Sequence, residues 1–157
     1  MKRKIYTFFT FLLTVVTFAC FLVSCNKGGE TKAKLESSTA EQIVIKIEET
    51  DGEANAFDAL KSLRNQDLIS FDYTESTYGA YVTSINGKAE QVIESTMTSA
   101  KGYSWALYTS DTEYAYTDST VTYGETVCGK SAMGASSVTV KKGAIYIWVY
   151  EYYEYTF

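Results

Sequence analysis

Residues 144–155 read AIYIWVYEYYEY, and this stretch near the end of the chain decides the fold. Its apolar residues alternate between two faces, as the side chains of a β-strand do. Ile145, Ile147 and Val149 fall on one face. The other face carries Tyr146, Trp148, Tyr150 and Tyr152. Because both faces are apolar, we expect a strand that is covered on both sides, or a central strand with one face left for a ligand.

A helix and several further strands precede this strand. Residues 43–48, IVIKIE, alternate with isoleucine on one face, which predicts a half-buried strand. After Asn55 as the N-cap, residues 56–66 predict an amphipathic helix. Further strands are expected at 69–73, 81–85, 103–109 and 138–140. For residues 113–117 and 120–127 two alternatives stay open, a hairpin that turns at Asp118-Ser119 or an irregular excursion. One helix with six or seven strands indicates the α+β class, with a mixed sheet and the helix across one face.

The first 24 residues have the features of a bacterial signal peptide. Residues 2–4 are basic, and residues 5–24 carry no charge. The sequence Leu22-Val23-Ser24-Cys25 resembles the lipobox of bacterial lipoproteins. This resemblance implies that residues 1–24 are removed and that Cys25 is lipidated, which would hold the protein on the extracytoplasmic side of the bacterial cell membrane. The alternatives are secretion without a lipid, or an uncleaved anchor, since about 20 apolar residues can span a bilayer.

A polar segment separates this anchor from the folded part of the chain. After Cys25, residues 26–41 read NKGGETKAKLESSTAE and contain almost no large apolar side chain. Such a segment cannot bury enough apolar surface to order itself. We therefore expect a flexible tether over residues 25–41 and one folded domain over residues 42–157.

The composition excludes several classes of function. The chain of 157 residues has no histidine and no proline. Without histidine there is no Ser-His-Asp or Cys-His catalysis and no HExxH zinc site. No GxSxG, SxxK, GxGxxG or Walker spacing occurs in the sequence, and no calcium-loop spacing either. We therefore expect no enzymatic activity, no metal site and no cofactor.

Charge and cysteine content limit the kinds of partner that we expect the chain to bind. The net charge is -5 for the whole chain and -8 after Cys25, because three of the 14 basic residues and none of the 19 acidic residues precede it. An acidic domain repels phosphate, so we expect no nucleic-acid partner. With Cys20 removed and Cys25 lipidated, only Cys128 remains. We expect it to be a small buried side chain, although a lone thiol can also pair between molecules or react.

The order of the segments resembles the transcobalamin-like C-terminal domain family. The matching motifs lie at Ala59-Leu60, at residues 81–87 (YVTSING), at Tyr103 to Trp105 and at Gly143 to Tyr150. Together with the strand IVIKI at residues 43–47, these make five weak motifs in the family's order, and the resemblance covers about residues 42–152. One departure is Ala144, which follows Gly143 where the family commonly has an acidic residue.

The resemblance implies a β-grasp-like fold, with one helix packed on a mixed sheet. It also implies a function: in intrinsic factor and transcobalamin this domain forms one half of a cobalamin site, and a helical barrel forms the other half. This chain has no barrel, so an isolated domain is expected to bind more weakly or to need a partner.

Two hypotheses for the function remain open. The first is a surface-tethered module that binds cobalamin or another corrinoid, and the second is an interaction or adhesion module that binds protein or glycan. Both use flat aromatic side chains with polar edges. The candidate ligand contacts are Tyr103, Trp105, Tyr146, Trp148, Tyr150 and Tyr152. For each of them, packing within the core or across the sheet is the competing interpretation.

Overall fold

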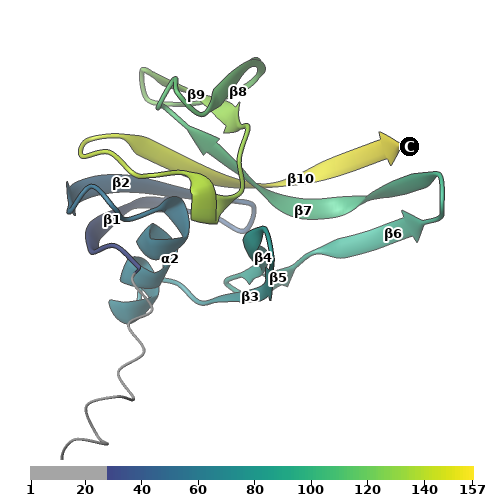
Figure 1. Cartoon of the computed structure of the whole chain (residues 1–157), viewed down its shortest axis with the longest axis horizontal. Coiled ribbons are helices and arrows are strands. Elements are labelled where there is room, and N and C mark those ends of the chain that lie inside the picture. The colour runs from purple at the N-terminus through teal and green to yellow at the C-terminus, as the bar shows by residue number, and fades with distance from the viewer. Residues whose placement is uncertain (1–27) are drawn as a thin grey trace, which may run out of the picture.

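The computed structural model describes residues 28–157, which form one helix and ten strands (Figure 1). The predicted signal peptide and the lipidated Cys25 lie outside the described residues. The elements are β1 (Thr31–Ser38), β2 (Gln42–Thr50), α2 (Ala56–Asn65), β3 (Phe71–Ser76), β4 (Gly79–Ile85), β5 (Lys88–Ala89), β6 (Gln91–Ser95), β7 (Ser99–Thr109), β8 (Ala115–Tyr123), β9 (Thr126–Ser131), a 3₁₀ turn η1 (Ala135–Ser137) and β10 (Ile145–Thr156). Within these residues, no helix has the length and apolar character needed to cross a membrane.

The strands form two sheets, and the fold belongs to the α+β class. The larger sheet has the order β1-β2-β10-β7-β9-β8, with β6 paired to β7, and the smaller sheet has the order β3-β4-β5. The prediction of a mixed sheet is wrong for the described chain, because every strand pair is antiparallel. The reason lies at the start of β10. The N–H of Gly143 donates to the carbonyl of Ile47, near the end of β2, so β10 enters there and runs back along β2.

The first half of β10 passes through the core. Tyr146 and Trp148 face the main core, which α2 and the smaller sheet close. Ile145 and Ile147 face a second cluster, which Cys128 and other residues of the β8–β9 hairpin close. Tyr146 and Ile147 are both fully buried, so this part of the strand is covered on both faces.

Helix α2 confirms the prediction over residues 56–66 and begins at the predicted cap. The Asn55 side chain accepts from the Asp58 N–H at 3.0 Å, and the Asp58 carboxylate accepts from the Asn55 N–H at 3.1 Å. This reciprocal pair satisfies two N–H groups that the helix leaves free. The helix then buries Leu60 and Leu63 completely against the sheet.

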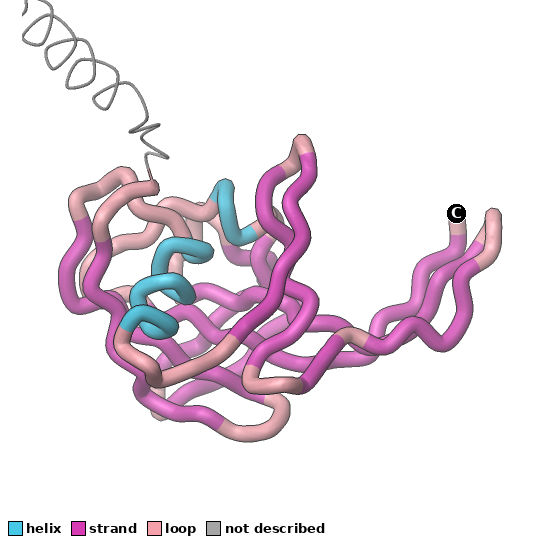
Figure 2. The backbone as a smooth tube through the Cα atoms, turned by 90° about the horizontal axis from the view of Figure 1, so that it is seen from below, coloured by secondary structure: helices cyan, strands magenta, loops and turns pink. Residues whose placement is uncertain are grey.

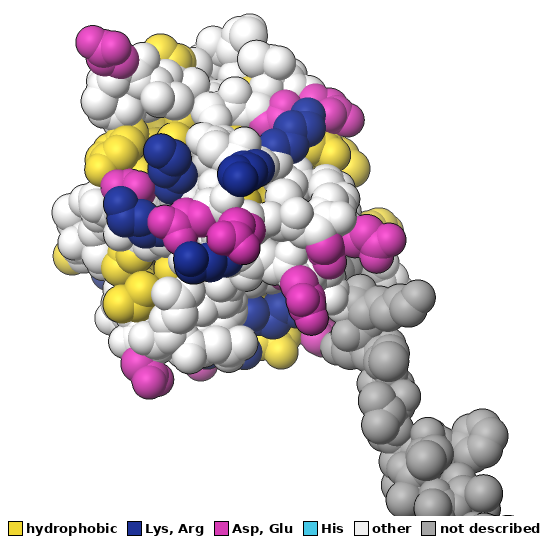
Figure 3. Space-filling view, turned by 90° about the vertical axis from the view of Figure 1, so that its left-hand side faces the viewer, with side chains coloured by type: hydrophobic (Ala, Val, Ile, Leu, Met, Phe, Trp, Pro, Cys, Tyr) yellow, Lys and Arg dark blue, Asp and Glu magenta, His cyan; other side chains and the backbone are white. Residues whose placement is uncertain are grey.

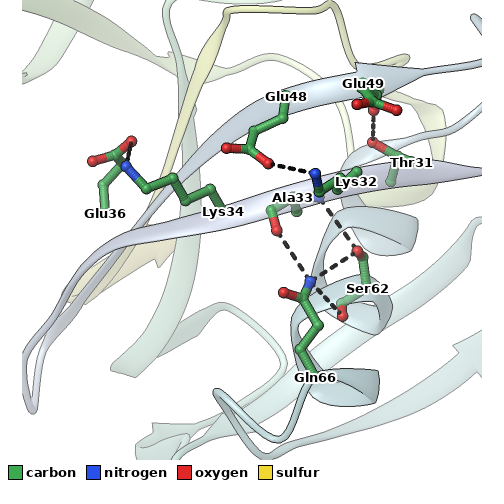
Figure 4. Close-up of polar contacts among 9 residues, drawn as sticks. All are labelled: Thr31, Lys32, Ala33, Lys34, Glu36, Glu48, Glu49, Ser62 and Gln66. Atoms are coloured by element: carbon green, nitrogen blue, oxygen red, sulfur yellow. Dashed lines mark hydrogen bonds and ion pairs between the residues drawn. The ribbon is translucent and has the colours of Figure 1, made fainter.

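The predicted flexible tether is wrong for residues 31–38, which form β1. The strand pairs with β2, and its Ala33 is only 2% exposed. Helix α2 covers the outer edge of β1: the Ala33 N–H donates to Ser62 Oγ at 3.3 Å, and Gln66 Nε2 donates to the Ala33 carbonyl at 3.1 Å (Figure 4). Few apolar side chains are needed here, because polar groups of the helix satisfy the backbone of the strand.

Residues 115–131 form a hairpin, but its turn comes later in the chain than the Asp118-Ser119 pair. Asp118 and Ser119 lie inside β8, and the chain reverses at Gly124-Glu125. Gly124 has φ of 59°, a left-handed conformation that glycine adopts without steric cost. The turn therefore forms where glycine permits it and not at the Asp-Ser pair.

The structural role of β1 leads to a testable prediction. In Ala33→Asp, a carboxylate would enter the main core without a cationic partner, so unfolding should become easier by about 3 kcal/mol or more. Urea unfolding of the chain from residue 25, followed by tryptophan fluorescence, measures this change. Lys34→Ala on the same strand is the control and should leave the midpoint almost unchanged. Equal midpoints for Ala33→Asp and the unsubstituted protein would mean that β1 behaves as a tether.

Candidate functional site

Three strands of the larger sheet continue beyond the core as a projecting arm (Figure 2). We define the arm as β6, residues 99–103 of β7 and residues 150–156 of β10. At the opposite end of the domain, basic and acidic side chains lie side by side (Figure 3). That visible face shows no patch of a single charge sign.

Three of the six aromatic candidates lie inside the domain. Tyr146 is fully buried, Trp148 is 3% exposed and Trp105 is 5% exposed. The hydroxyl of Tyr146 accepts from the Lys141 N–H at 3.1 Å, and Trp105 Nε1 donates to the Lys88 carbonyl at 2.8 Å. Tyr146 and Trp148 therefore act as core residues and are closed to a ligand, as the packing interpretation proposed.

The other three candidates form an aromatic ladder that leaves the core along the arm. The rings of Tyr103 and Tyr150 stack with centroids 5.7 Å apart, and Tyr103 meets Tyr152 edge to face at 5.5 Å. The Lys88 ammonium lies 4.5 Å from the centre of the Tyr150 ring and partly covers it. Tyr103 and Tyr152 remain 37% and 46% exposed. The ladder therefore offers a partly open aromatic surface.

A cleft of about 370 Å³ lies at an interruption in the sheet, and none of the three ladder residues lines it. On the β7 edge opposite β10, β6 pairs as far as Tyr103, and β9 pairs only from Tyr108 onward. Residues 104–107 therefore have no strand partner on that edge. Strand β4, the loop after β9 and η1 enclose the gap. Backbone groups of β7 consequently face the cleft without a neighbouring strand.

Aromatic rings dominate the walls of this cleft. Tyr81 of β4 and Tyr153 and Tyr155 of β10 all line it, together with Met133. The rings of Tyr153 and Tyr155 stack at 5.5 Å with an angle of 22°. Tyr153 lies across the strand from Gly102, where a Cβ atom would clash with the Gln91 carbonyl oxygen and come within 2.9 Å of the Tyr153 hydroxyl. Glycine at this position therefore leaves room for the backbone of β6 and for the Tyr153 hydroxyl.

The cleft carries no unpaired charge among the described residues that line it. Its two charged residues are Lys130 and Glu151, which form an ion pair with N–O distance 2.5 Å. The hydroxyl of Tyr108 also donates to Glu151, at 2.7 Å. At the other end, Tyr81 donates to Glu90 at 2.8 Å. Burial, followed by this hydrogen bond, raises the pKa of Tyr81 to about 12, so its hydroxyl stays protonated. The cleft therefore suits an uncharged ligand with a flat face.

Among the aromatic residues that line this cleft, the interpretation of the sequence named Trp105 and missed Tyr81, Tyr153 and Tyr155. Tyr153 and Tyr155 continue the face of β10 that begins with Ile145 and Ile147, so the alternation of the strand contained the signal. Tyr81 gave no comparable signal, because its position depends on how β4 packs against β7.

Other hollows of the described chain have fewer aromatic rings. One of about 740 Å³ lies between the start of β1 and α2 and has none, and one of about 380 Å³ beside β8 and β9 has only Tyr116. Within residues 28–157, no group of three or more acidic or cysteine side chains could hold a metal ion. Comparisons with protein-family models, with curated proteins and with solved structures find no match to this chain.

Cys128 is buried, as predicted, in the second cluster. Its side chain is fully covered, and its Sγ lies 3.9 Å from the Ile145 carbonyl. Burial raises the pKa of the Cys128 thiol to about 11, so little thiolate exists near neutral pH.

The environment of Cys128 predicts low reactivity. In a chain from residue 25 with Cys25→Ser, a thiol reagent such as DTNB should react with Cys128 near neutral pH only after urea is added. Burial and the scarcity of thiolate both slow the reaction. The absorbance of released thionitrobenzoate gives the rate. A native rate equal to the rate in urea would show that Cys128 is accessible and chemically available.

Proposed function

We propose that this chain is a bacterial lipoprotein, held in the membrane by a lipid on Cys25, whose domain binds cobalamin or another corrinoid. The signal-peptide pattern and the lipobox resemblance support the anchor. The order of the motifs supports a transcobalamin-like, β-grasp-like domain, and an α+β architecture with one helix on the larger sheet agrees with it. The domain would then face the extracytoplasmic side.

The observation that carries the ligand-binding proposal is the aromatic cleft at the interruption of β7. A corrinoid presents a flat ring edged by amide side chains. Flat tyrosine rings match the ring, and the backbone of residues 104–107, which has no partner strand there, can bond to amides. A cleft of about 370 Å³ lies at the small end of the range for ligand sites. It therefore forms one wall of a site, and a partner protein would complete it.

Titration with hydroxocobalamin tests this proposal. Because Trp105 lines the cleft, bound corrinoid should quench its fluorescence in a saturable way at high micromolar concentration. Tyr81→Ala and Tyr153→Ala each remove one ring and should weaken binding by about tenfold. Tyr116→Ala, an exposed ring that does not line the cleft, is the matched control. Absence of saturable quenching in the unsubstituted protein would reject binding by the isolated domain.

A second candidate is an interaction module for protein or glycan, which the exposed surface of the arm favours. Large apolar and aromatic side chains gather there without cover from the described domain: Val92, Ile93, Met97, Tyr103, Tyr152, Tyr155 and Phe157. Exposed groups of this kind mark interaction sites. Tyr152→Ala separates the two candidates. This substitution should leave the quenching by corrinoid unchanged. If the ladder binds glycan, it should also reduce retention of the protein on a cell-wall glycan column.

The anchor is tested at the mature N-terminus. In cells that process lipoproteins, mass spectrometry should find Cys25 as the first residue, with a diacylglyceryl group on sulfur. Cys25→Ser should abolish lipidation and release the protein from the membrane fraction. A mature form that still begins at Met1 would contradict this assignment.

A further inference from the structure

We propose that the free edge of β10 in the arm is a pairing site for an extended strand of a partner protein that carries lysine or arginine. This site uses the backbone edge of β10, whereas the cleft uses the side chains of Tyr153 and Tyr155 on a face of the same strand, and it does not depend on corrinoid binding. The site comprises residues 152–156, where β10 continues after its pairing with β2 has ended.

The geometry of β10 leaves one edge open along the arm. β10 pairs with β7 from Tyr146 to Thr156, but its pairing with β2 stops at Val149. The last contact on that side is the Tyr150 N–H, which donates to the Glu41 carbonyl at 2.8 Å. Backbone groups point to alternate sides along a strand. The N–H and C=O groups of Tyr152, Glu154 and Thr156 therefore point to an edge that no described strand occupies.

The outer edges of β1, β6 and β8 carry features that hinder strand pairing, and the free edge of β10 lacks most of them. The side chains of Ser62 in α2 and of Gln66 just after it bond to the outer edge of β1, and β1 also carries lysines and two register shifts. The register shifts once between β6 and β7, and once between β8 and β9. The pairing of β10 with β7 has no shift, and Glu154 is the one charged side chain of residues 152–156. An edge with unpaired backbone groups and few protective features is a template for pairing with another strand.

Glu154 defines the charge of the strand that fits. It lies on the same face as Tyr152, whose hydroxyl donates to it at 2.9 Å. It makes no ion pair with any described residue, because Lys101 across the strand is bound to Glu94 at 2.7 Å. An antiparallel partner would place a lysine or arginine opposite Glu154 and an apolar residue opposite Tyr152. The cation then comes two residues before the apolar residue in the partner sequence.

A second copy of this chain fits the edge poorly. A second β10 would bring its own Glu154 and no cation, so two copies would place two uncompensated carboxylates along one short ribbon. The whole domain is acidic as well, which opposes self-association. Charge complementarity therefore favours a basic partner strand.

The test uses the chain from residue 25 with Cys25→Ser and three synthetic peptides. The probe has the sequence VKVYTKVY. One control peptide, VEVYTEVY, reverses the charge, and the other is the probe methylated on the backbone nitrogens of its pairing face. Hydrogen exchange followed by NMR should show the amides of Tyr152, Glu154 and Thr156 slowed at least tenfold by millimolar probe, and by neither control peptide.

Two substitutions separate backbone pairing from side-chain contact. Glu154→Pro removes an N–H on the free edge and keeps the pairing with β7, so it should abolish binding of the probe. Glu154→Gln keeps the N–H and should weaken binding only severalfold, with less dependence on salt. Unchanged amide shifts in the core show that both variants are folded.

Three results would overturn the proposal. The first is that millimolar probe does not slow the exchange of the three amides. The second is that Glu154→Pro binds the probe as strongly as the unsubstituted protein does. The third is a dimer in sedimentation that Glu154→Pro abolishes. The last result would assign the edge to a second copy. Hydroxocobalamin quenching in Glu154→Gln should equal that of the unsubstituted protein, so failure of strand pairing leaves the corrinoid proposal standing.

Discussion

The rest of the structure depends on one constraint: β10 is longer than the core it crosses. It holds one continuous register with β7 from Tyr146 to Thr156, but β2 accompanies it only as far as Val149. The first half is therefore buried on both faces, and the second half must be stabilised by its own side chains and by β6 and β7. The core, the aromatic ladder and the open edge are successive parts of this single strand.

Periodicity and local capping made much of the fold predictable. The alternation of isoleucines in 43–48 and of two apolar sets in 144–155 gave β2 and β10, because a half-buried or fully buried strand leaves that pattern. Asn55 gave the start of α2, because an N-cap is a local interaction between residues three apart. In each case the deciding contacts lie close in the sequence.

Contacts between distant residues decided the parts that could not be predicted. Strand β1 buries one side chain, Ala33, deep in the core, and the side chains of Ser62 and Gln66 bond to the backbone of its outer edge. The composition of residues 26–41 reveals neither contact. The alternation in β10 placed Tyr146 and Tyr152 correctly on one face. It could not show that α2 and the smaller sheet cover the first and leave the second open. The gap at residues 104–107 likewise exists only because β6 and β9 end where they do.

The choice of tyrosine on the arm follows from the same constraint. A ribbon of three strands outside the core needs apolar contact across it to remain ordered. Leucine or isoleucine at these positions would supply that contact but would expose an apolar edge that aggregates. Tyrosine packs through its ring, as Tyr103, Tyr150 and Tyr152 do, and its hydroxyl can find a polar partner, as Tyr150 does at the Ala89 carbonyl and Tyr152 at Glu154. The arm can therefore hold its conformation without a partner while its β10 edge stays open.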